Sequence, residues 1–260
     1  MALQTNTGSA DCYSFPPEDK LKAHFFPEVG LSGFSHLDGT IAMYSQVAAL
    51  IRPTDVVLEF GAGRGGNIST DPSPYRRWIQ TLHGRCAKVI GCDIDPVVRD
   101  NPFLDEGIVI YPGQPLPFPD SSFDLIVSNN VFEHVADAQL VANELLRILR
   151  PGGTICASTP NKFGYVALSA MLIRNTRHVS VLKRVQPYRL AMDVFPTLYK
   201  MNTFKTLNRL FSKSSQVVIY AHSAEPSYHF GNKLVFALFK FIHRLLPEMF
   251  ASTMYVFIRK

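Results

Sequence analysis

The sequence predicts an α/β protein built on a doubly wound, seven-stranded sheet that is mostly parallel, with an antiparallel last strand and a helical cap. Three observations lead to this fold class. Short apolar runs alternate with helical stretches from about residue 40 to 161, as in parallel strands joined by right-handed crossovers. The runs VVLEF, VIGC and LIVS are continuously apolar, as expected for strands with helices on both faces. A glycine-rich turn directly follows the first of these runs.

Seven strands are predicted. Five lie in the alternating region, at residues 56–60, 88–92, 107–111, 123–128 and 154–159. Two more, at 216–220 and 254–258, come after a change of pattern at residue 161 and are expected to rejoin the same sheet.

Helices are predicted from apolar spacing and from end signals. Residues 37–51 show helical periodicity that Pro53 stops. Ser73 and Pro74 open a helix that runs to about residue 82, and Asp137 caps one that runs to residue 149. Later we expect basic amphipathic helices over 163–201 and further helices over 203–211 and 232–246.

This pattern divides the chain into an N-terminal arm or lid at 1–37 with one short helix, a core at 38–161 and a helical cap at 162–260. Charge follows the division. Residues 1–161 carry 11 Lys and Arg against 18 Asp and Glu, a net of −7, whereas residues 162–260 carry 15 against 3, a net of +12. Such a surplus serves solubility alone, or it attracts an anionic acceptor, a membrane surface or a nucleic acid.

Composition indicates an ordinary globular chain, because 47% of the 260 residues are hydrophobic and 18% are charged. The four cysteines, at positions 12, 86, 92 and 156, form no CxxC pair, so we expect free thiols and neither disulfides nor a zinc site. The first residues show no basic leader or apolar run, which predicts a cytoplasmic protein.

The glycine turn fits GxGxxG through Gly61, Gly63 and Gly66, at the edge where open α/β sheets bind ligands. The motif alone is weak, since dinucleotide domains and purely structural turns also show it. Glu59 lies two residues before the turn, where a carboxylate would face an ammonium group rather than a pyrophosphate. Prolines at 72 and 74 place the next helix downstream instead of directly at the glycines. Both features favour a ligand with an amino-acid part.

The second strand ends in GCDIDP, which places Asp93 where its two oxygens can accept both hydroxyls of a ribose. Asp95 is the alternative residue for that role. A solvated turn carboxylate is the alternative explanation.

Four segments together resemble class I S-adenosylmethionine-dependent methyltransferases, which have a Rossmann-like core, and particularly the branch that includes ubiquinone and menaquinone methyltransferases and many small-molecule enzymes. The segments are LEFGAGRG, GCDIDP, LPFPDSSFDLIVSNNVFEHV and ELLRILRPGGTICASTPN, in this order. The resemblance covers about residues 54–161.

The resemblance implies S-adenosylmethionine as cofactor and gives roles to particular residues. Glycine-turn residues would wrap its methionine part, Glu59 would approach its amino group and Asp93 would hold its ribose. The glycine-turn residues in question are Gly61, Ala62 and Gly63. Two further residues are implied as cofactor contacts: Ile94 would pack against the adenine, and Asn129 would lie at the methionine end. Related enzymes often carry an acidic residue after the third strand, but this chain has YPGQPLPF, so adenine recognition would rest on backbone and Gln114.

Quinone methyltransferases of similar sequence show a Glu-x-x-Glu-His cluster that can hold a divalent cation. The corresponding residues here are Asn130, Glu133 and His134. Because an amide is a poorer ligand than a carboxylate for a hard cation, no metal is predicted.

Methyl transfer needs alignment more than catalytic side chains, but a hydroxyl acceptor benefits from a general base. His134 is the candidate base, with a purely structural histidine as the alternative. Asn130 and Asn161 are candidate substrate-binding residues, although Asn161 could merely cap its turn. SNNV is not the [DN]PPY signature of enzymes acting on exocyclic amines, so oxygen on a small molecule or glycan is the predicted target, with a membrane lipid or quinone as the alternative. A non-catalytic cofactor-binding module and a dinucleotide oxidoreductase are further alternatives.

The helix at 232–246 raises the question of a membrane partner. Five apolar residues can share one of its faces, while three cations lie mostly elsewhere. The apolar residues are Leu234, Leu238, Phe241, Ile242 and Leu245. The cations are Lys233, Lys240 and Arg244. The stretch is too short and too charged to span a bilayer, so it either packs on the domain or lies in the inner face of a membrane as a peripheral contact. No nucleic-acid module is visible.

Overall fold

The computed structural model describes residues 17–165, 167–168, 195–226 and 231–260. The chain divides into two compact units, Met1–His36 and Leu37–Lys260. The first unit contains two helices, α1 (Pro17–Phe25) and α2 (Val29–Ser32), where one was predicted. Gly33 ends α2 in the left-handed conformation, and Glu28 bonds the imidazole of His36 at 2.7 Å.

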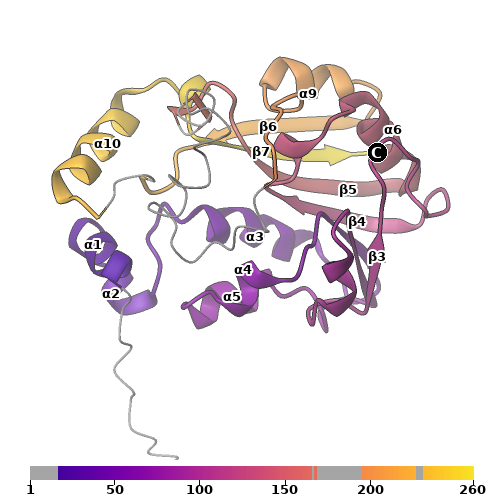
Figure 1. Ribbon diagram of the computed structural model, residues 1–260, viewed down its shortest axis with the longest axis horizontal. Coiled ribbons are helices and arrows are strands. Elements are labelled where there is room, and N and C mark those ends of the chain that lie inside the picture. Colours follow the sequence, from indigo (N-terminus) through magenta and orange to yellow (C-terminus); the bar gives the residue numbers. More distant parts are fainter. Residues whose placement is uncertain (1–16, 166, 169–194, 227–230) are drawn as a thin grey trace, which may run out of the picture. The chain divides into compact units, whose positions relative to one another are not determined.

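The second unit is built on one seven-stranded sheet with the order β3-β2-β1-β4-β5-β7-β6 (Figure 1). The first five strands are parallel, and β7 is antiparallel to both of its neighbours. The bounds are β1 Val56–Phe60, β2 Lys88–Asp93, β3 Glu106–Val109, β4 Phe123–Asn129, β5 Leu149–Pro160, β6 Gln216–His222 and β7 Thr253–Arg259. The predicted sheet, with its single antiparallel last strand, is confirmed.

Two helices of this unit begin at the caps that the sequence predicts. Ser73 accepts the amide of Arg76, and Asp137 accepts that of Leu140. The helices are α3 Gly39–Leu50, α4 Gly66–Ser69, α5 Pro74–Gln80, α6 Ala138–Ile148, α9 Phe204–Leu210 and α10 Lys233–Leu245, with 3-10 turns η1 Pro96–Asp100, η2 Phe132–His134 and η4 Glu248–Phe250. Among the described residues, none of these helices is both long and apolar enough to cross a membrane.

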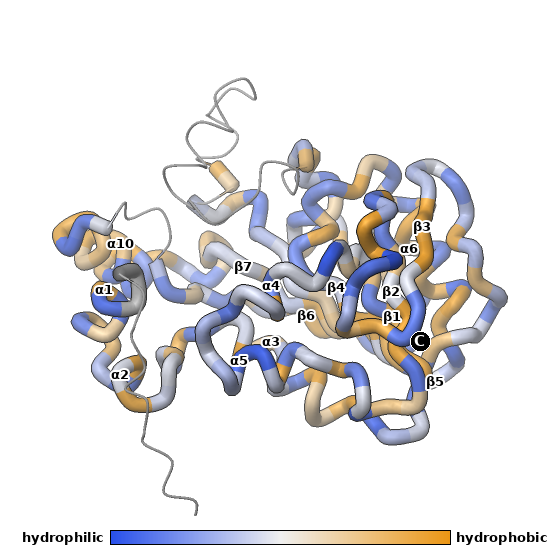
Figure 2. Tube along the Cα trace, turned by 60° about the horizontal axis from the view of Figure 1, so that its bottom comes forward, coloured by the Kyte–Doolittle hydropathy of each residue, from blue (hydrophilic) through white to orange (hydrophobic). Residues whose placement is uncertain are grey.

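Two apolar cores cover the two faces of the sheet. Within β1, Val57 packs in the core formed with α3 and α5, whereas the next residue, Leu58, packs in the core formed with α6 and α9. Figure 1 shows α3 and α5 on one side of the strands and α6 and α9 on the other, and Figure 2 shows the hydrophobic colour along the central strands. Burial on both faces explains why the strand sequences are continuously apolar.

Two predictions about this unit need correction. The helix after the glycine turn was expected only downstream of Pro72, but one helical turn, α4, starts directly at Gly66, and α5 follows as predicted. The third strand was expected to reach Tyr111 and ends at Val109, because the chain turns there: the amide of Gln114 donates to the carbonyl of Tyr111.

The prediction for 163–201 lies mostly outside the described residues. The strands predicted at 216–220 and 254–258 do rejoin the sheet, as β6 and β7. Residues 37–260 cluster as one compact unit, and the division of the chain into arm, core and cap stays a prediction.

Candidate functional site

The strand order reverses between β1 and β4, because the chain proceeds from β1 outward to β3 and then returns to the other side of β1. Ligands of open α/β sheets bind at this switch point, outside the carboxyl ends of the strands. Since β1, β2 and β4 are parallel neighbours, the residues that follow them meet at one edge of the sheet. Most of the predicted cofactor residues belong to these three strand ends.

The glycine turn after β1 is held against the end of β2. The amides of Gly61 and Ala62 both donate to the carbonyl of Cys92, at 2.8 and 3.1 Å. Gly61 has a φ of +78°, and a Cβ there would lie 2.2 Å from a methyl carbon of Val131. Gly63 also has a positive φ, +50°. Only glycine fits at position 61, because Val131 fills the place that a side chain would take.

Asp93 connects the two loops. Its Oδ2 accepts the amide of Gly63 and its Oδ1 accepts the amide of Asp95, both at 2.9 Å. Each carboxylate oxygen keeps a further lone pair for a hydroxyl group. The carboxylate of Asp95 is used differently, because it caps η1 by accepting the amide of Val97. Asp93 is thus better placed than Asp95 to meet a ribose.

Asn101 is a residue that sequence reasoning missed. This side chain is 6% exposed and donates to the carbonyls of Ala62 and Gly63, at 3.2 Å each. Its Oδ1 accepts the amide of Phe103, which fixes the side chain from the other end. Asn101 therefore stabilises the glycine turn through its hydrogen bonds to the backbone of Ala62 and Gly63. The signal available in the sequence was the Asn101-Pro102 pair, a typical turn former.

Glu59 is the fourth of the five residues of β1. Its carboxylate has no hydrogen-bond or ion-pair partner among the described residues. Burial raises its pKa from the usual 4.5 to about 7. A partly buried carboxylate without a partner is costly, so this position favours a ligand that brings a positive charge. The ammonium group of an amino acid is such a ligand.

The other predicted cofactor residues lie along the same edge. Asn129 ends β4, and its side-chain oxygen accepts the amide group of Asn130 at 3.2 Å. Ile94 follows Asp93 and is 46% exposed, as an apolar platform for a base would be. Gln114 is exposed in the turn after β3. All three are at least partly exposed. Among the described residues, none forms a hydrogen bond with the side-chain amide of Gln114.

His134 is held at the end of the turn η2, beyond β4. Its Nδ1 lies 2.9 Å from the carbonyl oxygen of Pro196, and its ring packs edge-on against Phe195. A carbonyl can only accept, so Nδ1 carries the proton, and the other ring nitrogen is Nε2. That nitrogen lies 3.8 Å from an oxygen of Glu133.

Glu133 faces the interior and belongs to a buried network. It is 4% exposed, and its Oε2 accepts the hydroxyl of Thr159 at 3.1 Å. Asn202 donates to the same hydroxyl oxygen at 2.7 Å and to the carbonyl of Pro160. Thr159 and Asn202 support the loop that carries His134, and sequence reasoning missed both.

The side chain of Asn161, a predicted substrate contact, is turned into the protein and bonds backbone groups there. Its side chain is fully buried and donates to the carbonyls of Met249 and Ala251, while its oxygen accepts the amide of Phe163. With donors and acceptor in use, Asn161 caps the turn after β5. Contact with a substrate would require these bonds to break.

The described residues contain no group of three or more His, Cys, Asp or Glu side chains that could hold a metal ion. Glu133 points into its network, and the amide of Asn130 bonds Asn129.

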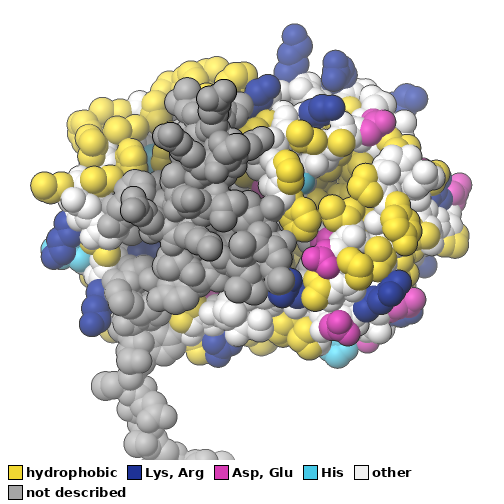
Figure 3. Space-filling view, viewed as in Figure 1, with side chains coloured by type: hydrophobic (Ala, Val, Ile, Leu, Met, Phe, Trp, Pro, Cys, Tyr) yellow, Lys and Arg dark blue, Asp and Glu magenta, His cyan; other side chains and the backbone are white. Residues whose placement is uncertain are grey.

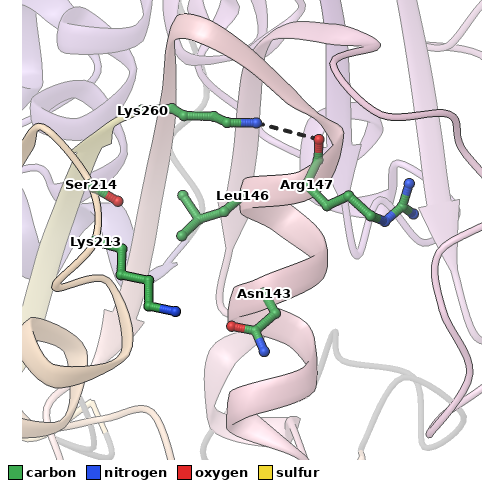
Figure 4. A pocket seen from close by; sticks show the side chains of 6 residues that line it. All are labelled: Asn143, Leu146, Arg147, Lys213, Ser214 and Lys260. Atoms are coloured by element: carbon green, nitrogen blue, oxygen red, sulfur yellow. Dashed lines mark hydrogen bonds between the residues drawn. The ribbon is translucent and has the colours of Figure 1, made fainter.

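A pocket elsewhere in the unit lies at the opposite edge of the sheet. Figure 4 shows it between the end of α6, the segment before β6 and the end of β7, with Lys260 donating to the backbone of Arg147. It is lined by Asn143, Leu146, Arg147, Lys213, Ser214 and Lys260. The amino ends of parallel strands meet at this edge, so the pocket is separate from the glycine turn.

Comparison with known proteins agrees with this geometry. Two family models, each described as a methyltransferase domain, match residues 58–157 and 113–215. The core is thus similar to methyltransferase domains. S-adenosylmethionine is the cofactor of such domains, and the residues present fit it. Glu59 offers a carboxyl group for its ammonium group, and the oxygens of Asp93 suit its ribose. The glycine turn offers backbone groups.

Relatives of the methyltransferase domain match it over short stretches. A probable S-adenosylmethionine-dependent methyltransferase of Mycolicibacterium smegmatis is 44% identical over 50 residues, which are 19% of this chain and 20% of that protein. An uncharacterized methyltransferase of Mycobacterium sp. strain KMS is 54% identical over 41 residues, 16% of each chain. The chain thus covers about a fifth or less of the length of these relatives.

Solved structures share the fold of the methyltransferase domain. A SAM-dependent methyltransferase from Archaeoglobus fulgidus has a TM-score of 0.52 at 14% identity, over 91% of this chain and 99% of that one. A SAM-dependent methyltransferase from Thermotoga maritima, described as a possible histamine N-methyltransferase, has a TM-score of 0.51 at 12% identity, over 94% and 98%. At these identities the likeness concerns the fold alone.

Proposed function

We propose that this protein transfers a methyl group from S-adenosylmethionine to an oxygen atom of a small molecule or glycan. The observation that carries the proposal is the position of His134, just past β4 and next to the strand ends that hold the cofactor residues. Its Nδ1 is fixed on the carbonyl of Pro196, which orients the imidazole ring.

The cofactor supplies an electrophilic methyl carbon on a sulfonium, which needs no activation by a side chain. The protein's task is alignment and exclusion of water. Glu59 binds the ammonium group, Asp93 accepts the ribose hydroxyls and the turn from Gly61 to Gly63 supplies backbone. Ile94 packs on the adenine, and Gln114 with the nearby backbone contacts its polar edge.

His134 acts as a general base in this proposal. Nε2 accepts the proton of the acceptor hydroxyl as the oxygen attacks, and the ring becomes positively charged. Glu133, 3.8 Å from Nε2, stabilises that charge. Asn130, exposed and next to Asn129, offers its amide oxygen to the acceptor.

A membrane lipid or quinone is the second candidate acceptor. It is favoured by one specific observation, the exposed apolar side chains of α10, among them Leu234 at 81% and Leu245 at 65% exposed. An enzyme that works on a lipid needs such a surface to reach its substrate.

The experiment is an assay of S-adenosylhomocysteine formation with labelled cofactor and fractions of a cell extract. Label in an aqueous small-molecule or glycan fraction supports the first acceptor class, and label in the lipid fraction supports the second. Cofactor binding without product in any fraction would overturn the enzyme proposal in favour of a binding module. His134→Gln should abolish most turnover while cofactor binding persists.

A further inference from the structure

The exposed side of α10 carries an apolar stripe. Leu234, Leu238, Phe241 and Leu245 follow one another at intervals of four, three and four residues, which places them on one helix face. They are 81%, 55%, 59% and 65% exposed. Figure 3 shows hydrophobic side chains gathered over α10. A soluble helix normally turns such a stripe toward a core.

The opposite side of α10 is the one that packs on the domain. Phe236 is fully buried. The rings of Phe239 and His243 lie against that of Tyr165, with centroids 5.2 and 5.1 Å apart. The helix therefore already has a buried face, and the apolar stripe is a second one that stays exposed in the part of the chain that the structure describes.

The exposed apolar surface continues beyond the helix. Leu246 and Met249 are 36% and 55% exposed, so residues 234–249 hold six of the sixteen exposed large hydrophobic side chains found among the described residues. This concentration distinguishes the segment from the scattered apolar residues of an ordinary surface.

Cations flank the stripe along one side. Lys233, Lys240 and Arg244 are spaced by seven and four residues, and α10 contains no acidic residue. Lys233 and Arg244 are exposed and have no ion-pair partner among the described residues. The surrounding half of the chain, residues 162–260, has a net charge of +12.

We propose that α10 docks the protein on an anionic lipid bilayer, lying in the plane of the interface with the apolar stripe among the acyl chains and the cations at the headgroups. A helix of 13 residues is roughly 20 Å long, which is too short to span a bilayer but suits this orientation. A second copy of the chain is a poorer partner, because α10 offers no acidic side chain to neutralise the cations.

The test is sedimentation of the whole protein with vesicles of phosphatidylcholine alone or mixed with equal parts of phosphatidylglycerol, without cofactor. We expect retention on the anionic vesicles at least ~10-fold stronger than on the neutral ones, and a loss of retention at ~1 M salt. Because no methyl transfer is measured, this proposal and the proposed activity can fail independently.

Two variants separate the contributions. Leu238→Gln with Phe241→Gln should reduce retention at least ~10-fold, and Lys233→Gln with Arg244→Gln should remove the preference for anionic vesicles. Trp78→Gln, which removes a 57% exposed aromatic from α5, is the matched control and should retain full binding. Thermal unfolding of each variant identifies any that fails to fold.

Equal retention of the wild type and the Leu238→Gln/Phe241→Gln variant would overturn the proposal. So would light scattering that shows a wild-type dimer which this variant dissociates, because the stripe would then be an interface between copies. Absence of retention on both vesicle types overturns it as well.

Discussion

Gly63 donates its backbone hydrogen to Oδ2 of Asp93 at 2.9 Å, so the carboxylate that ends β2 holds the turn that follows β1. The same carboxylate accepts the amide of Asp95 through its other oxygen. Asp93 thus shapes both loops before any ligand arrives. A ribose that bonds these oxygens meets a carboxylate that is already oriented.

Asp93→Asn should weaken binding of S-adenosylhomocysteine by about 1 to 3 kcal/mol, roughly 5- to 150-fold, because an amide nitrogen cannot accept one of the two backbone hydrogens. Titration calorimetry measures the effect. Asp95→Asn is the control, since that carboxylate caps η1. A larger loss in the Asp95 variant would transfer the ribose role to that residue.

Glu59→Gln should change the pH dependence of stability. Burial raises the pKa of Glu59 to about 7, so between about pH 4.5 and 7 the folded cofactor-free protein holds a proton that the unfolded chain has released. The contribution of Glu59 to stability therefore falls as the pH rises through this window. The variant should be more stable than the wild type at pH 8, by at most about 3 kcal/mol, yet bind the cofactor more weakly.

Urea unfolding at pH 5 and pH 8 measures the stability difference for Glu59→Gln. Glu106→Gln, which changes an exposed carboxylate paired with Lys88, is the control and should shift stability by less than about 1 kcal/mol. An identical pH dependence in wild type and Glu59→Gln would contradict the assignment.

Gly61→Ala should destabilise the protein by about 2 to 4 kcal/mol, because the new Cβ meets Val131 at 2.2 Å and the backbone φ is +78°. Adding Val131→Ala should recover the steric part. Gly113→Ala is a matched control: its φ is also +78°, but no heavy atom lies within 4 Å of the Cβ position. It should cost only about 1 to 2 kcal/mol, as measured by chemical unfolding.

His134→Gln should lower kcat by about 10²- to 10⁴-fold with the acceptor that the extract assay identifies, since the base is lost while the cofactor residues are unchanged. Calorimetry should show unaltered cofactor affinity. His83→Gln, at an exposed imidazole paired with Asp105, should leave kcat unchanged. If kcat survives in His134→Gln, the histidine is structural.

Asn161→Ala should reduce the free energy of unfolding by at least about 1 to 3 kcal/mol, because two carbonyls and one amide lose their partner in the interior. Residual folded enzyme should keep its KM for the acceptor. Asn143→Ala, on the exposed side of α6, should stay within about 0.5 kcal/mol of the wild type. A raised KM without loss of stability would restore Asn161 as a substrate contact.

The sheet could be predicted from the sequence because burial on both faces leaves a continuous apolar run at each central strand. Two helix starts, at Ser73 and Asp137, were also readable, since a cap depends on only three neighbouring residues. The start of α4 was not, because a four-residue helix has no periodicity to detect.

The sequence predicted where a candidate side chain lies only at the ends of strands, and the roles of these residues stay predictions. Glu59 and Asp93 follow directly from where β1 and β2 end. The contacts of Asn101 with Ala62 and Gly63 bridge 38 to 39 residues and exist only after the loop folds back. For Asn161 a substrate contact and a turn cap were both expected, and the sequence does not say which way a side chain rotates at the end of a strand.

The antiparallel pairing of β5 with β7 also affects the order of folding. Thr253 pairs with Pro160, which precedes it by 93 residues. Until β7 is synthesised, the outer edge of β5 has no strand beside it, and unpaired edges invite association with other chains. During synthesis the chain therefore carries an unpaired strand edge from the time β5 forms until β7 is available to cover it.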